Sequence, residues 1–214
     1  MSGRSLLIVG AGGHAEVAFD VARRMGCFAD ISFSSNIEHP ETLMGRPVLD
    51  ESRVWETGPG AWGACFVAVG DNAARESLTA GLLSAGARMA TLIHPSATVS
   101  PGARLGEGCI VCAGANVGPS SAVGDGSIVN TGADVDHGCR VGRFCHLSPH
   151  AAMGGGSSVG DRSWLCIGSC MADHISLAAD SVLGAGSALL RDAGAPGLYV
   201  GSPARLVRGI DDFA

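Results

Sequence analysis

The chain has 214 residues, of which 46% are hydrophobic and 33 are glycine, and its net charge at pH 7 is −6. This length allows one or two domains, and the acidic balance argues against a nucleic acid or an anionic membrane as a partner. The sequence has no run of 18 apolar residues, and its N-terminal apolar stretch is too short for a signal peptide, so we expect a cytoplasmic protein.

The first predicted elements form a βα unit. Residues 5–9 are apolar and predict a buried strand, and the glycine-rich segment 10–15 leads into a helix that we expect to end near Arg24. Glycines at such a turn let the backbone approach a phosphate, which the free N–H groups and the helix dipole favour. The turn alone fits an NAD site, a nucleotide-sugar site or a tight turn without a ligand.

A second βα unit follows, with a strand over residues 64–69, a Gly-Asp-Asn turn at 70–72 and a helix from Ala73 to about Ala85. An NAD enzyme favours an acidic residue at the end of its second strand. The segment 31–36 ends in Ser34, Ser35 and Asn36 instead, which argues against NAD. Residues 1–92 are therefore predicted to form a Rossmann-like domain with its ligand at the carboxyl ends of the strands.

The rest of the chain is dominated by a repeat of six residues. An aliphatic residue occupies every sixth position, namely Val99, Leu105, Val111, Val117, Val123, Val129, Val135, Val141, Leu147, Met153, Val159, Leu165, Met171, Leu177, Leu183 and Leu189. Hexapeptide repeats are typical of parallel β-helices, in which three hexapeptides close one triangular coil. Residues 18 apart should then be stacked about 4.8 Å apart. We expect this domain, with a C-terminal tail, over residues 93–214.

The eight cysteines fit this fold as reduced thiols. Cys109, Cys139 and Cys145 occupy the small position two residues before the aliphatic one, and that position faces the core. We therefore expect buried thiols rather than disulfides.

Polar and ionisable residues gather in one part of the repeat, namely Asn130, Asp134, Asp136, His137, His146 and His150. His137 precedes Gly155 by 18 residues, so the two should be stacked at the same corner of adjacent coils. A histidine can take a proton from an attacking amine or hydroxyl at neutral pH. A neighbouring backbone N–H can stabilise the oxyanion of a tetrahedral intermediate. This pair predicts a site of acyl transfer.

Several motifs spread over the chain carry a family resemblance; they are residues 8–15, 69–72, 93–97, 130–137, 142–149 and 200–205. On these motifs the chain resembles the bacterial sialic acid O-acetyltransferase-type sugar acyltransferases, and among them most closely the nucleotide-linked amino-sugar N-acetyltransferases. The resemblance implies a left-handed β-helix, a homotrimer and acetyl-CoA as the co-substrate, with no metal required.

The resemblance also implies residue roles. His137 matches the general base, the Gly155 N–H matches the oxyanion donor and His146 matches a histidine beside the thioester. Ile167 and Ala185 match positions where the backbone meets the pantetheine arm. The substrate-binding positions are Gly12, Gly13, His14, Ser35, Gly70 and Asn72.

One departure concerns the residue after the general base. The family usually has an acidic residue there to orient the imidazole, whereas this chain has Gly138. Asp136 or Asp134 is a candidate to replace it; otherwise the base is weaker than in the family or the substrate differs.

The leading hypothesis is N-acetylation of the amino group, at C4, of a sugar linked to a nucleoside diphosphate, either UDP or GDP. The first alternative is O-acetylation of the sialic acid type, which needs stronger base catalysis because an alcohol is a weaker nucleophile. The second is a zinc protein of the γ-carbonic anhydrase type with His137, His146 and His150 as ligands. The third is a sugar-nucleotide binding or scaffold protein without catalysis.

Overall fold

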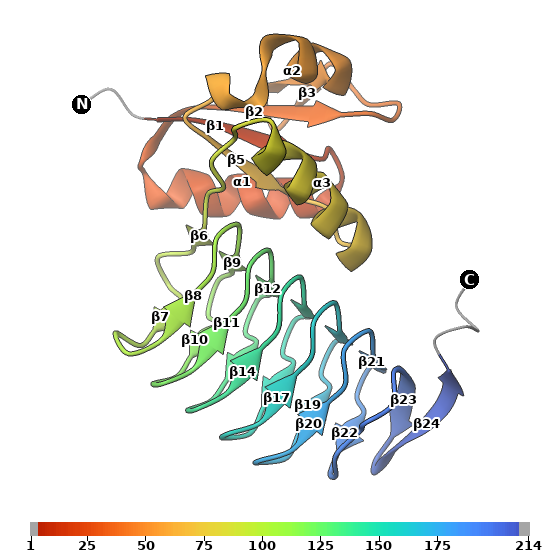
Figure 1. The fold of residues 1–214 in the computed structure, drawn as a ribbon. Helices are drawn as coiled ribbons and strands as arrows, with labels where there is room; N and C mark the ends of the chain where they lie inside the picture. The colour runs from red at the N-terminus through yellow and green to blue at the C-terminus, as the bar shows by residue number, and fades with distance from the viewer. Residues whose placement is uncertain (1–3, 210–214) are drawn as a thin grey trace. The chain divides into compact units, whose positions relative to one another are not determined.

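The computed structural model describes residues 4–209 and divides into two units, Met1–Pro95 and Ser96–Ala214. In Figure 1 the colours from red to yellow mark the first unit, and those from green to blue mark the second. Each unit has buried apolar side chains of its own.

The first unit is an α/β domain, as predicted. Its elements are β1 (Arg4–Val9), α1 (Gly13–Met25), β2 (Phe28–Ser35), β3 (Thr42–Leu43), β4 (Arg46–Asp50), α2 (Glu51–Thr57), a 3-10 turn (Pro59–Ala61), β5 (Ala64–Val67), α3 (Asn72–Ser84) and β6 (Leu92–Ile93). The sheet order is β3-β4-β2-β1-β5, and only the β3–β4 pair is antiparallel among the described strands of this sheet. The short helix α2 was not predicted.

Apolar side chains explain why this sheet forms. Residues 6–9 of β1 and all of β5 are buried, as expected for strands in the middle of a parallel sheet. Helix α1 packs its apolar stripe on the sheet, with the rings of Phe19 and Phe33 5.5 Å apart. Helix α3 begins where the Asp71 carboxylate accepts a hydrogen bond of 2.7 Å from the Ala74 N–H.

The second unit contains many short parallel strands, consistent with a left-handed β-helix. Within its described residues, sixteen two-residue strands each end on a predicted aliphatic position; they are β7 (Thr98–Val99), β8 (Arg104–Leu105), β9 (Ile110–Val111), β10 (Asn116–Val117), β11 (Ala122–Val123), β12 (Ile128–Val129), β13 (Asp134–Val135), β14 (Arg140–Val141), β15 (His146–Leu147), β16 (Ala152–Met153), β17 (Ser158–Val159), β18 (Trp164–Leu165), β19 (Cys170–Met171), β20 (Ser176–Leu177), β21 (Val182–Leu183) and β22 (Ala188–Leu189).

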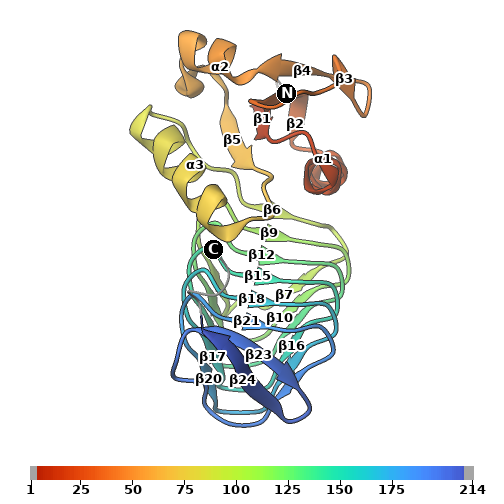
Figure 2. The ribbon, with the colours of Figure 1, turned by 90° about the vertical axis from the view of Figure 1, so that its right-hand side faces the viewer.

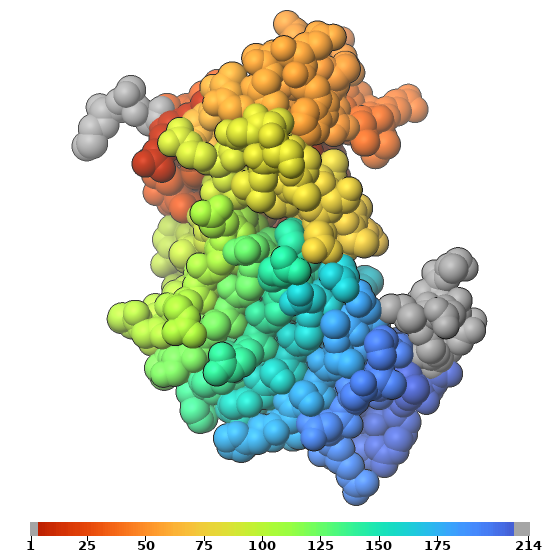
Figure 3. Space-filling view, in the orientation of Figure 1, coloured from red at the N-terminus to blue at the C-terminus, as the bar shows by residue number. Residues whose placement is uncertain are grey.

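The register between coils is 18 residues, as the repeat predicts. Val117, for example, pairs with Val135, and Val135 with Met153. Three faces result in the described part of this unit: one from β7 to β22, one from β8 to β20, and one from β9 through β21 to the final hairpin. The hairpin consists of β23 (Gly197–Gly201) and β24 (Ala204–Gly209). Figure 2 shows the coils stacked, and Figure 3 shows their colours succeeding one another in sequence order.

The core of the second unit contains the predicted thiols. Cys109, Cys139 and Cys145 are fully buried and unpaired with other cysteines. Burial raises the pKa of the Cys109 thiol to about 11, so this group stays protonated at neutral pH.

Candidate active site

The glycine turn between β1 and α1 requires glycine at its first position. Gly10 has a φ of +122°, and a methyl group on it would lie 2.7 Å from the Ala68 carbonyl oxygen. Its N–H donates to the Ser34 carbonyl at 2.8 Å. Gly12 caps α1, and neither Gly12 nor Gly13 has an atom within 4 Å of the position of a methyl group. The backbone at this helix N-terminus is therefore open to a ligand.

A cavity of about 460 Å³, which we call the glycine-turn cavity, lies over this helix end; it is lined by Val9, Gly10, Ala11, Gly12, Gly13, His14, Ser34, Ser35, Asn36, Ile37, Glu51, Ala68, Val69, Gly70, Ala74 and Leu78. The structure thus brings together the predicted substrate-binding residues Gly12, Gly13, His14, Ser35 and Gly70. The sixth, Asn72, is not in the lining. Its Oδ1 accepts a hydrogen bond of 2.7 Å from Arg75 instead.

His14 is a neutral group at pH 7. Burial, and then the nearby charge of Arg75, lower the pKa of this histidine from 6.5 to about 4. The imidazole therefore adds no positive charge to the cavity lining at neutral pH.

Arg75 is buried in α3 and holds the loop between β5 and α3 in place. Its Nη1 donates to the carbonyl oxygens of Val69 at 2.9 Å, Gly70 at 3.1 Å and Asp71 at 3.4 Å. The sequence did not identify this residue, because an arginine in a helix gives no sign by itself that it turns inward.

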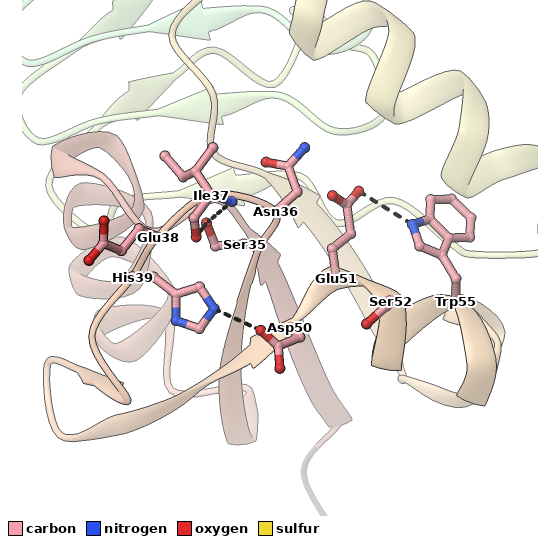
Figure 4. Close-up of a pocket in the computed structure, with 9 residues that line it drawn as sticks. All are labelled: Ser35, Asn36, Ile37, Glu38, His39, Asp50, Glu51, Ser52 and Trp55. Atoms are coloured by element: carbon pink, nitrogen blue, oxygen red, sulfur yellow. Dashed lines mark hydrogen bonds and ion pairs between the residues drawn. The ribbon is translucent and has the colours of Figure 1, made fainter.

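A second cavity of about 700 Å³, which we call the Trp55 cavity, is lined by Ser35, Asn36, Ile37, Glu38, His39, Asp50, Glu51, Ser52 and Trp55 (Figure 4). The two cavities share Ser35, Asn36, Ile37 and Glu51, so they adjoin each other. Asn36 directly follows the predicted Ser35, so the sequence could have identified it as a binding residue as well. The sequence analysis missed Glu51 and Trp55 because they belong to α2, a helix that was not predicted.

In the second unit, His137 and Gly155 lie at the same corner of adjacent coils. A methyl group on Gly155 would lie 2.8 Å from Nε2 of His137 and 3.0 Å from its Nδ1. The Gly155 N–H donates no hydrogen bond within residues 4–209, whereas the corner N–H of Arg143 donates to Asp161 at 2.8 Å. At this corner the exposed imidazole of His137 therefore lies next to Gly155, whose N–H has no hydrogen-bond partner among residues 4–209.

Asp136 holds the imidazole of His137. Its Oδ1 accepts the His137 backbone N–H at 2.6 Å and lies 3.1 Å from Nδ1 of the ring. The backbone N–H bond first, and then the bond from the ring, lower the pKa of the Asp136 carboxyl, so it is ionised at neutral pH. Asp134 does not share this role, because its Oδ1 accepts from Nδ2 of Asn116 at 2.7 Å.

Gly138, where the sequence departs from the family, has a φ of +67°. Glycine adopts this left-handed conformation without steric cost. The acidic group of this corner thus precedes the histidine instead of following it.

His146 lies on a different part of the coil from His137. His137 is at the corner between β13 and β14, whereas His146 begins β15 in the third face. Its ring stacks on Trp164, with centroids 5.6 Å apart and planes 5° apart, and its Nε2 lies 3.3 Å from Nδ2 of Asn130. The described chain does not bring these two histidines together.

Ile167 and Ala185 lie one above the other on adjacent coils, in the turns that follow β18 and β21 of that third face. Both are exposed, and the Gly186 N–H donates to the Ile167 carbonyl at 2.9 Å. They form an accessible edge next to the strands that carry His146 and Trp164.

Among residues 4–209, no three histidine, cysteine or acidic side chains come close enough together to hold a metal ion, and this includes His137, His146 and His150. Likewise, the described part of the chain has no helix with both the length and the apolar character needed to cross a membrane.

Known proteins resemble this chain over nearly all of its length. Residues 5–82 match the family model described as the PglD N-terminal domain. The acetyltransferase domain of PglB from Neisseria gonorrhoeae FA1090 is 34% identical, with a TM-score of 0.92 over 95% of this chain and 100% of that chain. It has also been solved in complex with acetyl coenzyme A.

A second relative is PerB from Caulobacter crescentus, solved in complex with CoA and GDP-perosamine. It is 38% identical, with a TM-score of 0.87 over 94% of this chain and 96% of that chain. WeeI from Acinetobacter baumannii AYE, at 16% identity and a TM-score of 0.59, shares the fold.

Proposed function

We propose a function on one premise: this chain belongs to the PglD-type family of sugar N-acetyltransferases. It is an acetyltransferase that acts on nucleotide-linked amino sugars with acetyl-CoA as the acetyl donor. The mechanism proposed below rests on one observation. The His137 imidazole lies over Gly155, and the Gly155 N–H has no hydrogen-bond partner in the described chain.

In the reaction, the amine nitrogen of the sugar attacks the thioester carbonyl carbon of acetyl-CoA. His137 removes the proton that the nitrogen must lose, and the Gly155 N–H donates to the oxyanion of the tetrahedral intermediate. The C–S bond then breaks, and the proton held by His137 passes to the departing sulfur, which gives CoA and the amide. Atoms and charge balance without any further reactant.

Asp136 orients the base in this mechanism. A carboxylate that accepts from Nδ1 leaves the lone pair on Nε2, the nitrogen that faces Gly155 at the shorter distance. It also stabilises the imidazolium that forms when the proton is taken up. Asp136 thereby supplies what the family's acidic residue after the histidine supplies.

The first unit binds the nucleotide part of the substrate. The diphosphate is placed at the N-terminus of α1, where Gly12 and Gly13 leave the backbone open and the helix dipole favours negative charge. Neutral His14 and the loop fixed by Arg75 complete this pocket. The amine acetylated is the one at C4 of a 4-amino-4,6-dideoxy sugar.

The active form is a homotrimer in which adjacent copies share each site. One copy supplies His137 and Gly155, and its neighbour supplies His146, Ile167 and Ala185 for the acetyl-CoA. The separate positions of His137 and His146 on one coil support this arrangement. Sedimentation equilibrium should therefore give three times the chain mass of 21.4 kDa.

The experiment is a thiol-release assay with acetyl-CoA and a panel of nucleotide-linked sugars that carry either an amine or a hydroxyl at C4. Release of CoA with an amino sugar, and a product heavier by one acetyl group, supports the proposal. Turnover of hydroxy sugars alone would identify an O-acetyltransferase. Absence of turnover with every amine would overturn the proposed function.

A further inference from the structure

The Trp55 cavity has no role in the mechanism above. It is larger than the glycine-turn cavity, and the two adjoin through Ser35, Asn36, Ile37 and Glu51. A ligand whose phosphates lie at the glycine turn therefore has room to extend into the Trp55 cavity.

The polar groups of this cavity are arranged around Glu51. The Trp55 indole N–H donates to Oε1 of Glu51 at 3.3 Å, which holds the carboxylate in place and leaves Oε2 without a hydrogen bond in the described chain. The Asn36 side-chain amide likewise makes no hydrogen bond among residues 4–209. The cavity thus offers acceptors, amide donors and an indole that is 41% exposed.

A buried hydroxyl gives an independent sign of a ligand. Ser34 is fully buried and lines the glycine-turn cavity, yet its Oγ has no hydrogen-bond partner among the described residues. Buried hydroxyls nearly always have a partner, so we expect a ligand in the glycine-turn cavity to supply one.

Charge decides which end of a nucleotide lies where. Glu38, Asp50 and Glu51 line the Trp55 cavity together with His39, whose Nε2 lies 3.4 Å from Oδ1 of Asp50. Carboxylates repel phosphates, whereas the N-terminus of the 13-residue helix α1 attracts them. The Trp55 cavity therefore suits the base of a nucleotide rather than its phosphates.

We propose that the Trp55 cavity binds the base of the substrate and selects guanine, so that the substrate is a GDP-linked sugar. This inference rests on the proposed function. The guanine edge presents two adjacent donors, N1–H and the N2 amine, which match the two oxygens of a carboxylate such as Glu51. Its O6 and N7 are acceptors that match the Asn36 amide, and Trp55 supplies a stacking surface.

Pyrimidine bases fit the same groups less well. Uracil and thymine present a single N3–H between two carbonyl oxygens, and those oxygens would face the Glu51 carboxylate with like partial charge. Cytosine has one amine next to an unprotonated nitrogen, which again meets the carboxylate with a lone pair. Each pyrimidine also lacks the second ring that the larger cavity accommodates.

The test measures binding of GDP, UDP, CDP and IDP to the full chain by calorimetry, without acetyl-CoA. GDP should bind at least about tenfold more tightly than UDP or CDP, and IDP, which lacks the N2 amine, should bind about tenfold more weakly than GDP. Tighter binding of UDP or CDP than of GDP would overturn the inference, as would absence of binding by all four.

The Glu51→Gln variant makes the test specific for the carboxylate. It should lower GDP affinity by about 10- to 100-fold, leave UDP affinity unchanged and shift preference toward XDP, whose C2 carbonyl accepts from the new amide. Glu41→Gln is the matched control, because Glu41 is exposed and lies outside the cavity lining. An unchanged ratio of GDP to XDP affinity in Glu51→Gln would overturn the inference.

The two proposals fail separately. GDP binding with the expected preferences, but without acetyl transfer to any GDP-linked amino sugar, would overturn the proposed function and leave the base assignment standing. Acetyl transfer to UDP-linked sugars in preference to GDP-linked ones would do the reverse.

Discussion

The imidazole of His137 lies over Gly155, the residue that follows it by one full coil of the β-helix. No side chain is compatible with both this backbone and this ring position, since even a methyl group would lie 2.8 Å from Nε2. Glycine at position 155 therefore leaves room for the imidazole at this corner. A larger residue at position 155 should therefore disturb the His137 ring.

Gly155→Ala should lower kcat by about 100-fold or more, because the methyl group displaces the imidazole from the position in which it meets the amine. Steady-state kinetics with the acceptor found in the panel checks this. Gly102→Ala is the control: its methyl group would meet only ordinary contacts, the nearest at 3.7 Å from the Ser120 nitrogen. Equal kcat values for the two variants would contradict the assignment of this corner.

Asp136→Asn should lower kcat by about tenfold and leave KM for both substrates nearly unchanged, because the amide no longer stabilises the imidazolium. Asp134→Asn changes a neighbouring carboxylate that bonds to Asn116 and should have little effect. Asp136→Glu should recover part of the lost rate. A larger loss of kcat in Asp134→Asn than in Asp136→Asn would show that the orienting role belongs to Asp134.

The depressed pKa of His14 predicts a loss of stability at low pH. The native state keeps this group neutral down to about pH 4, whereas the unfolded chain protonates it near its ordinary pKa of 6.5. The stability that depends on neutral His14 is therefore complete above about pH 6.5 and declines as the pH falls toward 4, by about 3 kcal/mol in all.

Urea unfolding at a series of pH values measures this decline. His14→Gln should flatten it, while His150→Gln, which changes an exposed histidine of the second unit, should leave it as in the wild type. A steep decline that persists in His14→Gln would place its source in another group.

The proposed homotrimer, in which adjacent copies share each site, predicts complementation between two impaired chains. His137→Ala and His146→Ala homotrimers should both be impaired, whereas mixed trimers of co-expressed chains should recover roughly a third of wild-type activity, since one of the three subunit contacts in every mixed trimer pairs an intact His137 with an intact His146. Purification by two different tags, followed by the thiol-release assay, checks this. Mixed trimers without activity would argue that each chain builds its site alone.

The sequence predicted the second unit almost residue by residue. An unbroken period of six aliphatic positions leaves only one way to bury them, so each predicted position from Val99 to Leu189 ends a strand. The stacking of His137 on Gly155 follows from the same arithmetic. The first unit was predicted in outline, with α1 ending at Met25, one residue beyond the expected Arg24.

The sequence did not show in which direction several side chains point, and the features it did not predict depend on those directions. Asp134 and Asp136 were equal candidates, and their separation required the structure, in which Asp134 lies on β13 and bonds to its neighbour in β10. Glu51 and Trp55 lie on a seven-residue helix too short to show a clear period. Arg75 turns inward only because backbone carbonyls surround it.

The central claim is that His137 is the base that accepts the amine proton, and kcat of His137→Ala tests it most directly. With the amino sugar identified in the panel, the variant should transfer acetyl groups at least about 100-fold more slowly than the wild type while binding CoA and the sugar nucleotide with unchanged affinity. A kcat within a few-fold of the wild-type value would contradict the account.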